Sequence, residues 1–231
     1  MKHIVDLESW ERRGNYAFFR DHLNAWYSVT TELDCTESYE QSKQTGRSFF
    51  LRYLYAALRA ANEVPAFRYR MDAQGQIVWY DTVDIITPIA LPSGNFCTVR
   101  IPYQVDFDEF AAQAERLIQE NARSGDPYGV EQAIFASGEY DIVHLSAVPR
   151  LYFTAMTYTS YRIGQGCTHP LMTAGKAISR ADRWVMPFSV YVNHAFVDGS
   201  HLSTFFEKMQ SFLSSPLDRM STPANKEDAL G

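Results

Sequence analysis

One stretch decides the fold: Trp184-Val-Met-Pro-Phe-Ser-Val-Tyr-Val-Asn-His-Ala-Phe-Val-Asp-Gly-Ser-His201. Its first part, up to Val192, is rich in β-branched and aromatic residues and too short for a helix with caps, which predicts a buried strand. The residues after Asp198 repeat apolar side chains at helical spacing, which predicts an amphipathic helix. These apolar positions are Leu202, Phe205, Phe206, Met209 and Leu213.

His194 lies where the predicted strand ends, and Asp198 and Gly199 complete an HxxxDG motif. A side chain at a strand end projects into a cleft mouth while the sheet holds its backbone, which suits a general base. An imidazole there can take a proton from an alcohol as its oxygen attacks a thioester, and no protein nucleophile is needed. The structural alternative is a hydrogen-bonded core histidine beside an aspartate that only caps the helix.

Four blocks of the chain, spread over roughly residues 1 to 213, resemble the chloramphenicol acetyltransferase family in matching order. Asn193–Gly199 resembles its HHAVCDG motif, and Ser146-Ala-Val-Pro149 resembles its SAxPW segment. Trp10–Arg13 followed by Tyr16–Arg20 is similar to WxRREHFxxY, and Ile77–Trp79 with Asp81 is similar to IVWDS. The resemblance implies a CoA-dependent acyltransferase fold of the α/β (α+β) type, with a mixed β-sheet covered by helices.

The same resemblance assigns catalytic roles. His194 would be the general base, and Ser146 would donate to the tetrahedral oxyanion, with Thr173 helping to hold a water there. Asp198 would pair with Arg12 to fix the backbone of the site, although the neighbouring Arg13 leaves that assignment open by one position. Without the resemblance, a loop serine before a proline turn is the favoured interpretation of Ser146.

An apolar acceptor pocket is the second implication. Its wall would consist of Phe18, Phe19, Leu23, Ala25, Tyr27, Phe96, Phe135 and Tyr158, although each of these residues taken singly is typical of plain core. Phe19 replaces a family tyrosine, Tyr158 a leucine, Arg150 the tryptophan of SAxPW, and Asn193 the first histidine. These substitutions leave the residues expected to carry out acyl transfer intact, and they affect which acceptor molecule the pocket would bind.

Acetyl-CoA is the acyl donor that the resemblance implies, with no metal. The sequence has no glycine-rich phosphate loop, so the donor site depends on the resemblance alone. Lys176 matches a basic residue near the nucleotide end of that site, and Ala177 replaces the adjacent aromatic residue. Family members are homotrimers with active sites between subunits, so a homotrimer is the implied assembly.

The expected function is therefore acetyl-CoA-dependent O-acetylation of a small alcohol, foremost chloramphenicol. One alternative is a dihydrolipoyl acyltransferase core, which shares HxxxDG but would be expected with a lipoyl domain and linker. Another is a binding protein of the same fold that has lost turnover. Transfer to dihydrolipoamide, or ligand binding without CoA release, would distinguish these alternatives.

Composition agrees with one enzyme domain over 1–214 and a flexible tail over 215–231. The net charge of −6 and the pI near 5.5 argue against a nucleic-acid partner. Three cysteines without CxxC spacing, Cys35, Cys97 and Cys167, indicate reduced thiols and neither a disulfide framework nor a zinc site. The charged N-terminus and the lack of a long apolar stretch favour a cytoplasmic protein without a membrane partner.

Further elements follow from periodicity and turn residues. Residues 48–62 predict a buried helix, and 107–121 a solvent-facing helix. A hairpin is expected from 67–71 and 77–83, and a loop from 121–130. Strands are expected over 141–145 and 151–161.

Overall fold

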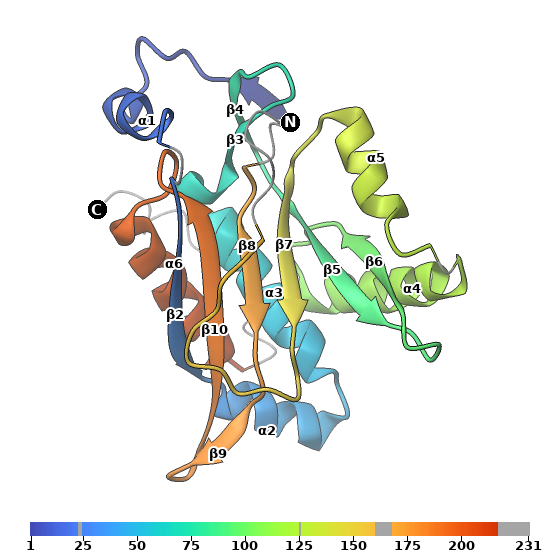
Figure 1. Cartoon of the computed structure of the whole chain (residues 1–231). Helices are drawn as coiled ribbons and strands as arrows, with labels where there is room; N and C mark the ends of the chain where they lie inside the picture. Colours follow the sequence, from blue (N-terminus) through green and yellow to red (C-terminus); the bar gives the residue numbers. More distant parts are fainter. Residues whose placement is uncertain (23–24, 125, 160–167, 217–231) are drawn as a thin grey trace.

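The computed structural model describes residues 1–22, 25–124, 126–159 and 168–216 and shows a large mixed sheet beside a small one (Figure 1). The large sheet has the strand order β2-β10-β8-β7-β5-β6, with β9 paired to β10, and the small sheet has the order β1-β4-β3. Strands β5, β7 and β8 run parallel, and the other pairs are antiparallel. The predicted mixed sheet with helices is confirmed.

The strands of the large sheet are β2 (Trp26–Asp34), β5 (Asp84–Ala90), β6 (Phe96–Ile101), β7 (Ile142–Ala147), β8 (Leu171–Ala174), β9 (Ile178–Arg180) and β10 (Arg183–Asn193). Those of the small sheet are β1 (Lys2–Ile4), β3 (Tyr69–Met71) and β4 (Ile77–Tyr80). The helices are α1 (Arg13–Phe19), α2 (Thr36–Thr45), α3 (Phe49–Glu63), α4 (Phe107–Ser124), α5 (Gly129–Ser137) and α6 (Gly199–Leu213), with a short 3₁₀ turn at Pro65–Arg68.

Strand β10 is the central element that the sequence predicted. It pairs with β2 over nine residue pairs, from Val185 opposite Asp34 to Asn193 opposite Trp26, and its other edge pairs with β8. Most of its side chains are buried because both faces of the sheet are covered here. Helix α6 follows after one turn, with Leu202, Phe205, Met209 and Leu213 buried, as the spacing predicted.

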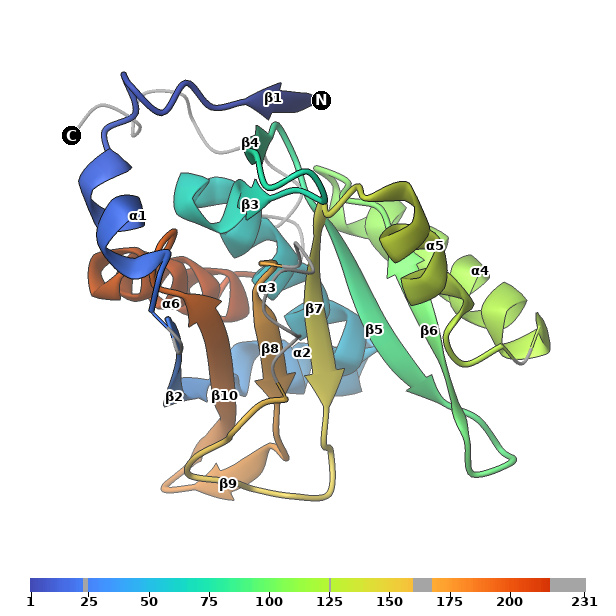
Figure 2. The same cartoon turned by 45° about the horizontal axis from the view of Figure 1, so that its top comes forward.

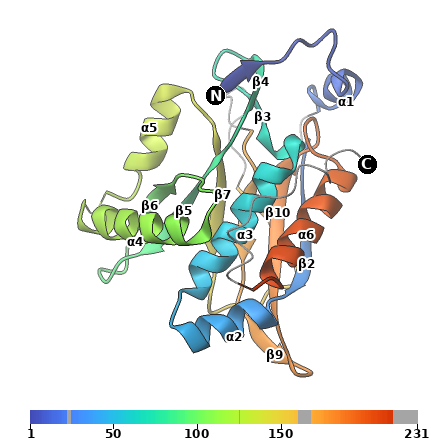
Figure 3. The ribbon, with the colours of Figure 1, turned by 180° about the vertical axis from the view of Figure 1, so that it is seen from behind.

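One face of the large sheet is covered by α2, α3, α4 and α6 (Figure 3). Helix α3 begins after Ser48, whose side chain accepts from the amide of Leu51, and most of its residues are buried. The main core lies between these helices and the sheet, and it includes Val143 and Leu145 of β7. The helix predicted over 48–62 is therefore confirmed.

The opposite face is covered by α5 and by the segment 151–159 (Figure 2). Because side chains alternate along a strand, Ile142 points to this face while Val143 points to the main core. Ile142 forms a second, smaller core with Ile86, Ile134 and Tyr140. The strand predicted over 151–161 is wrong for its described residues, which lie across the sheet as irregular chain.

The reason lies in how that segment is held. Ser28 Oγ donates to the carbonyl of Met156 at 3.2 Å, and the hydroxyl of Tyr158 donates to the carbonyl of Ser189 at 3.1 Å. Side-chain hydroxyl groups therefore hold the segment 151–159 across the strands. Its aromatic and β-branched residues are typical of a strand, but the segment does not form the backbone hydrogen bonds of one.

Two further expectations need correction. The loop predicted over 121–130 is shorter, because α4 continues to Ser124 and α5 begins at Gly129. Helix α4 is not simply solvent-facing, because Phe107, Phe110 and Ala114 are buried in the main core. The hairpin is confirmed as β3 and β4, and no helix in the described ranges is long and apolar enough to span a membrane.

Candidate active site

His194 lies directly after β10, in the turn that leads to α6. Its amide donates to the carbonyl of Ala25 at 2.7 Å, and the side chain of Asn193 accepts from the amide of Ala195 at 2.9 Å. These bonds attach the turn to the segment before β2 and to the end of β10. The backbone of His194 is therefore fixed by the sheet, as the sequence predicted.

Two aromatic rings hold the imidazole of His194. Phe19 of α1 stacks on it with ring centroids 4.1 Å apart and planes 8° from parallel, and Tyr27 of β2 lies at 4.7 Å. The Nδ1 atom is enclosed and has no hydrogen-bond partner among the described residues. No carboxylate of the described ranges bonds to this ring, so the arrangement differs from a Ser-His-Asp triad.

Asp198 serves the turn in two ways. Its Oδ1 accepts from the amides of Ser200 and His201 at the start of α6, with the reciprocal bond from its own amide to the His201 ring. Its Oδ2 accepts from Arg12 Nη1 at 3.0 Å, across 186 positions of sequence. The N-cap interpretation and the Arg12 partnership are both seen in the structure.

Arg12 and Arg13 have different surroundings. The side chain of Arg12 is only 11% exposed, whereas Arg13 is largely exposed and pairs with Glu8 at 2.9 Å. Burial alone would raise the pKa of Asp198, but hydrogen bonds from Ser200 and Arg12 and the nearby His201 hold that pKa well below its usual value. The carboxylate therefore stays ionised beside the guanidinium at neutral pH.

Ser146 and Thr173 belong to a second cluster on neighbouring strands. They face each other in the parallel pairing of β7 with β8, on the sheet face that α5 and the segment 151–159 cover. Both line a cavity of about 360 Å³. The other lining residues are His144, Met156, Thr157, Tyr158, Thr159, Leu171 and Met172.

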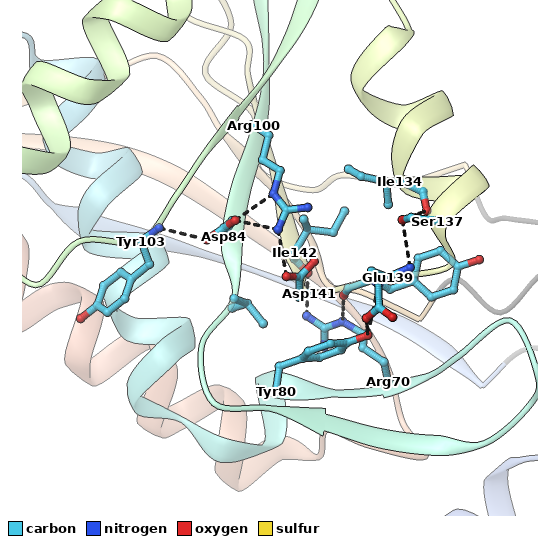
Figure 4. A network of polar contacts seen from close by, with 12 residues as sticks. Arg70, Tyr80, Asp84, Arg100, Tyr103, Ile134, Ser137, Glu139, Asp141 and Ile142 are labelled. Carbon is cyan, nitrogen blue, oxygen red and sulfur yellow. Dashed lines mark hydrogen bonds and ion pairs between the residues drawn. The ribbon is translucent and has the colours of Figure 1, made fainter. Parts of the chain in front are cut away.

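Charged side chains fix the start of β7, the strand that carries Ser146 (Figure 4). Arg100 Nη2 bridges Asp84 at 2.7 Å and Asp141 at 2.9 Å. Buried Arg70 donates to the carbonyls of Tyr140 and Ile142 at 2.9 and 2.6 Å. These contacts set the position of β7 before the chain reaches the cavity.

The two clusters lie apart in one copy of the chain. Ser146, Thr173 and Ser189 are level with one another across β7, β8 and β10. His194 lies five residues beyond Ser189, which is roughly 16 Å further along the strand, and β7 is two strands, or about 10 Å, to the side. His194 and Ser146 of one copy therefore cannot contact the same reacting atom.

The other residues expected to form the wall of the acceptor pocket are not brought together in one copy of the chain. Phe18 is exposed and packs edge-on against Phe19 near His194, and Ala25 holds the His194 amide. Tyr158 lines the cavity, whereas Phe96 and Phe135 are exposed and are not among the residues that line it. Leu23, like Cys167, is outside the described residues.

Lys176 is exposed just after β8. Its amide donates to the carbonyl of Leu151 at 2.8 Å, which places it beside the exposed Arg150. Gly175 makes this contact possible, because a Cβ there would lie 2.5 Å from Pro187 and 2.8 Å from Phe153. No ion pair is found for Lys176 or Arg150 within the described ranges.

His144 is the cavity residue that the sequence reasoning missed. It precedes Ser146 by two positions on β7, so both side chains point to the same face of the sheet. The strand predicted over 141–145 contains His144, two positions before Ser146. This two-residue spacing could have shown that both side chains lie on one face of the sheet. Burial lowers the pKa of His144 to about 4, so its ring is neutral at pH 7.

Solved acyltransferases share the arrangement of strands and helices seen in this chain. The dihydrolipoamide acetyltransferase of Azotobacter vinelandii superposes with a TM-score of 0.61 at 17% identity, covering 87% of this chain and 86% of that chain, which shows the fold alone. A solved chloramphenicol acetyltransferase superposes with a TM-score of 0.88 at 47% identity, covering 92% of this chain and 100% of that chain.

Sequence comparison gives the family. Residues 2–210 match the chloramphenicol acetyltransferase family, and chloramphenicol acetyltransferase 2 of Escherichia coli is 27% identical over 89% of this chain and 94% of its own length. The enzyme of Streptomyces acrimycini is 27% identical over 92% and 94%. The chain belongs to the chloramphenicol acetyltransferase family and is an acyltransferase.

Proposed function

We propose that this enzyme transfers the acetyl group of acetyl-CoA to a hydroxyl of chloramphenicol and so inactivates the antibiotic. The observation that carries the proposal is His194 at the end of β10, held between Phe19 and Tyr27 with its backbone bound to Ala25. The family membership supports the substrate, because the matched relatives are named for it.

His194 acts as the general base. Its imidazole takes the proton from the acceptor hydroxyl as the oxygen bonds to the thioester carbonyl carbon. When the carbon–sulfur bond breaks, the CoA thiolate leaves and receives the proton from the imidazolium. The products are the acetyl ester and CoA–SH, and His194 is again neutral.

Ser146 stabilises the negative charge on the carbonyl oxygen. Ser146 lines the cavity opposite Thr173 on the neighbouring strand, where a hydroxyl donor can meet the tetrahedral oxyanion. Because His194 and Ser146 of one copy are too far apart, the Ser146 that serves a given His194 belongs to another copy. This requirement supports a homotrimer with each active site between two subunits.

Arg12 and Asp198 keep the turn after β10 in place. The ion pair joins the segment before α1 to the N-terminus of α6, and His194 lies in the turn that leads into α6. Lys176, which is exposed and has no ion pair among the described residues, is proposed to bind a phosphate of CoA. The supply of acetyl-CoA is the reason to place the enzyme in the cytoplasm.

Thiol release from acetyl-CoA tests the proposal. The purified protein is incubated with acetyl-CoA, with and without chloramphenicol, and the product is identified by mass. We expect chloramphenicol-dependent release and a product heavier by one acetyl group. Release that needs dihydrolipoamide instead, or no release by folded protein, would refute it.

A further inference from the structure

The cavity beside Ser146 is more polar than the aromatic wall expected from the sequence. Six of its nine lining residues carry a hydroxyl or an imidazole, and Tyr158 is its one aromatic hydrocarbon ring. The hydroxyl of Tyr158 is already used by the carbonyl of Ser189. His144, Thr157 and Thr159 are further polar residues among those that line the cavity.

His144 is placed to contact an acceptor that reacts beside Ser146. Alternate residues on one face of a strand are roughly 7 Å apart, so the two side chains can contact groups on one small molecule. The Nε2 atom of His144 has no hydrogen-bond partner in the described part of the chain. A buried polar group without a partner is costly, so a ligand that supplies one gains affinity.

We propose that His144 is a specificity-determining residue, whose imidazole hydrogen-bonds a second hydroxyl of the acceptor while the first hydroxyl is acetylated beside Ser146. This inference rests on the proposed acetyl transfer. It identifies the acceptor class as compact molecules with two hydroxyls a few bonds apart. A neutral ring accepts and donates one bond each, so it suits a hydroxyl better than a charged group.

Chloramphenicol and its analogue without the secondary hydroxyl form the matched pair for the test. We expect wild type to prefer chloramphenicol in kcat/KM by about tenfold, the contribution of one good hydrogen bond. His144→Leu abolishes this preference by lowering kcat/KM for chloramphenicol while the rate with the analogue is unchanged. His144→Gln retains part of the preference, because its amide can still hydrogen-bond.

His3→Leu is the control, because His3 is an exposed histidine on β1 that pairs with Asp81. It keeps the full preference. An equal loss with both acceptors in His144→Leu, or a preference that survives the substitution, overturns the inference while the acetyl transfer stands. A folded wild type that acetylates neither compound overturns both the proposed function and the inference.

Discussion

At the scale of single residues, the turn between β10 and α6 gathers the chemistry of the site. His194 and Asp198 are four residues apart, whereas Arg12 lies 186 positions before Asp198 and bonds to its carboxylate. No spacing rule predicts a contact across 186 positions, so Arg12 could be predicted only through the family resemblance. His194 and Asp198 could be found from the sequence because a strand, a turn and a helix meet there.

Replacing His194 with Ala should lower kcat by roughly 10² to 10⁴-fold, the usual contribution of a general base. The fold should hardly change, because the ring packs against Phe19 and Tyr27, which are themselves only half-buried. Thiol release and thermal melting of the same preparation measure both effects. His3→Ala is the control, and a His194→Ala enzyme with wild-type turnover would rule out the base.

The Asp198→Asn substitution tests the ion pair separately from the helix cap, because asparagine is also a good N-cap. Arg12 would then be left partly buried without its carboxylate, which should cost about 3 kcal/mol of unfolding free energy and reduce activity. Asp21→Asn, which breaks an exposed pair with Arg20, should change stability by about 0.5 kcal/mol or less. Urea unfolding compares the two variants, and unchanged stability and rate in Asp198→Asn would contradict this role.

At the scale of elements, the helices and strands that could be predicted correctly are those whose apolar side chains repeat at a regular spacing. Strand β10 and helices α3 and α6 repeat apolar side chains at the period of their structure, and the structure confirms them. Helix α2 has no such pattern, since Ser38 and Ser42 are its buried residues. The segment 151–159 has strand-like composition but is held by tertiary contacts that composition does not reveal.

Strand β7 should make stability depend on pH through His144. The unfolded imidazole binds a proton below about pH 6.5. The folded one stays neutral until pH falls to about 4. The unfolded state therefore binds more protons between these values, and stability falls as pH drops from 7 to 5, by about 2 kcal/mol.

His169, a buried histidine whose pKa burial also lowers, should add to this loss. Urea unfolding at pH 7 and pH 5 measures the difference, which should shrink in His144→Asn. A pH dependence that is the same in the variant would show that His144 does not contribute.

The contact between β8 and the segment 151–159 depends on Gly175. Gly175→Ala places a methyl group within 3 Å of Pro187 and Phe153, so the segment must move, at a cost of about 1–3 kcal/mol. Gly14→Ala in α1 has open space around it and should be neutral or stabilising. Melting temperatures of the two variants test this, and equal values would contradict the close packing.

At the scale of the whole molecule, His194 and Ser146 lie too far apart within one copy to contact the same reacting atom. His194, the proposed base, follows the end of β10 (Figure 1), and Ser146, the proposed oxyanion donor, lines the cavity on β7 and β8. A site between subunits was expected from the family resemblance alone, because the distance between His194 and Ser146 within one copy depends on strand register, which the sequence does not reveal. The register of β10, β8 and β7 supports an active site that needs two copies of the chain.

Mixing inactive variants tests that central claim most directly. His194→Ala and Ser146→Ala protomers are each assayed alone, then unfolded together, refolded as mixed assemblies and assayed for chloramphenicol-dependent thiol release. A mixed interface that joins an intact His194 to an intact Ser146 restores a complete site, so we predict that activity returns to a substantial fraction of wild type. Mixed assemblies, verified by mass, that stay as inactive as the separate variants would contradict a site shared between copies.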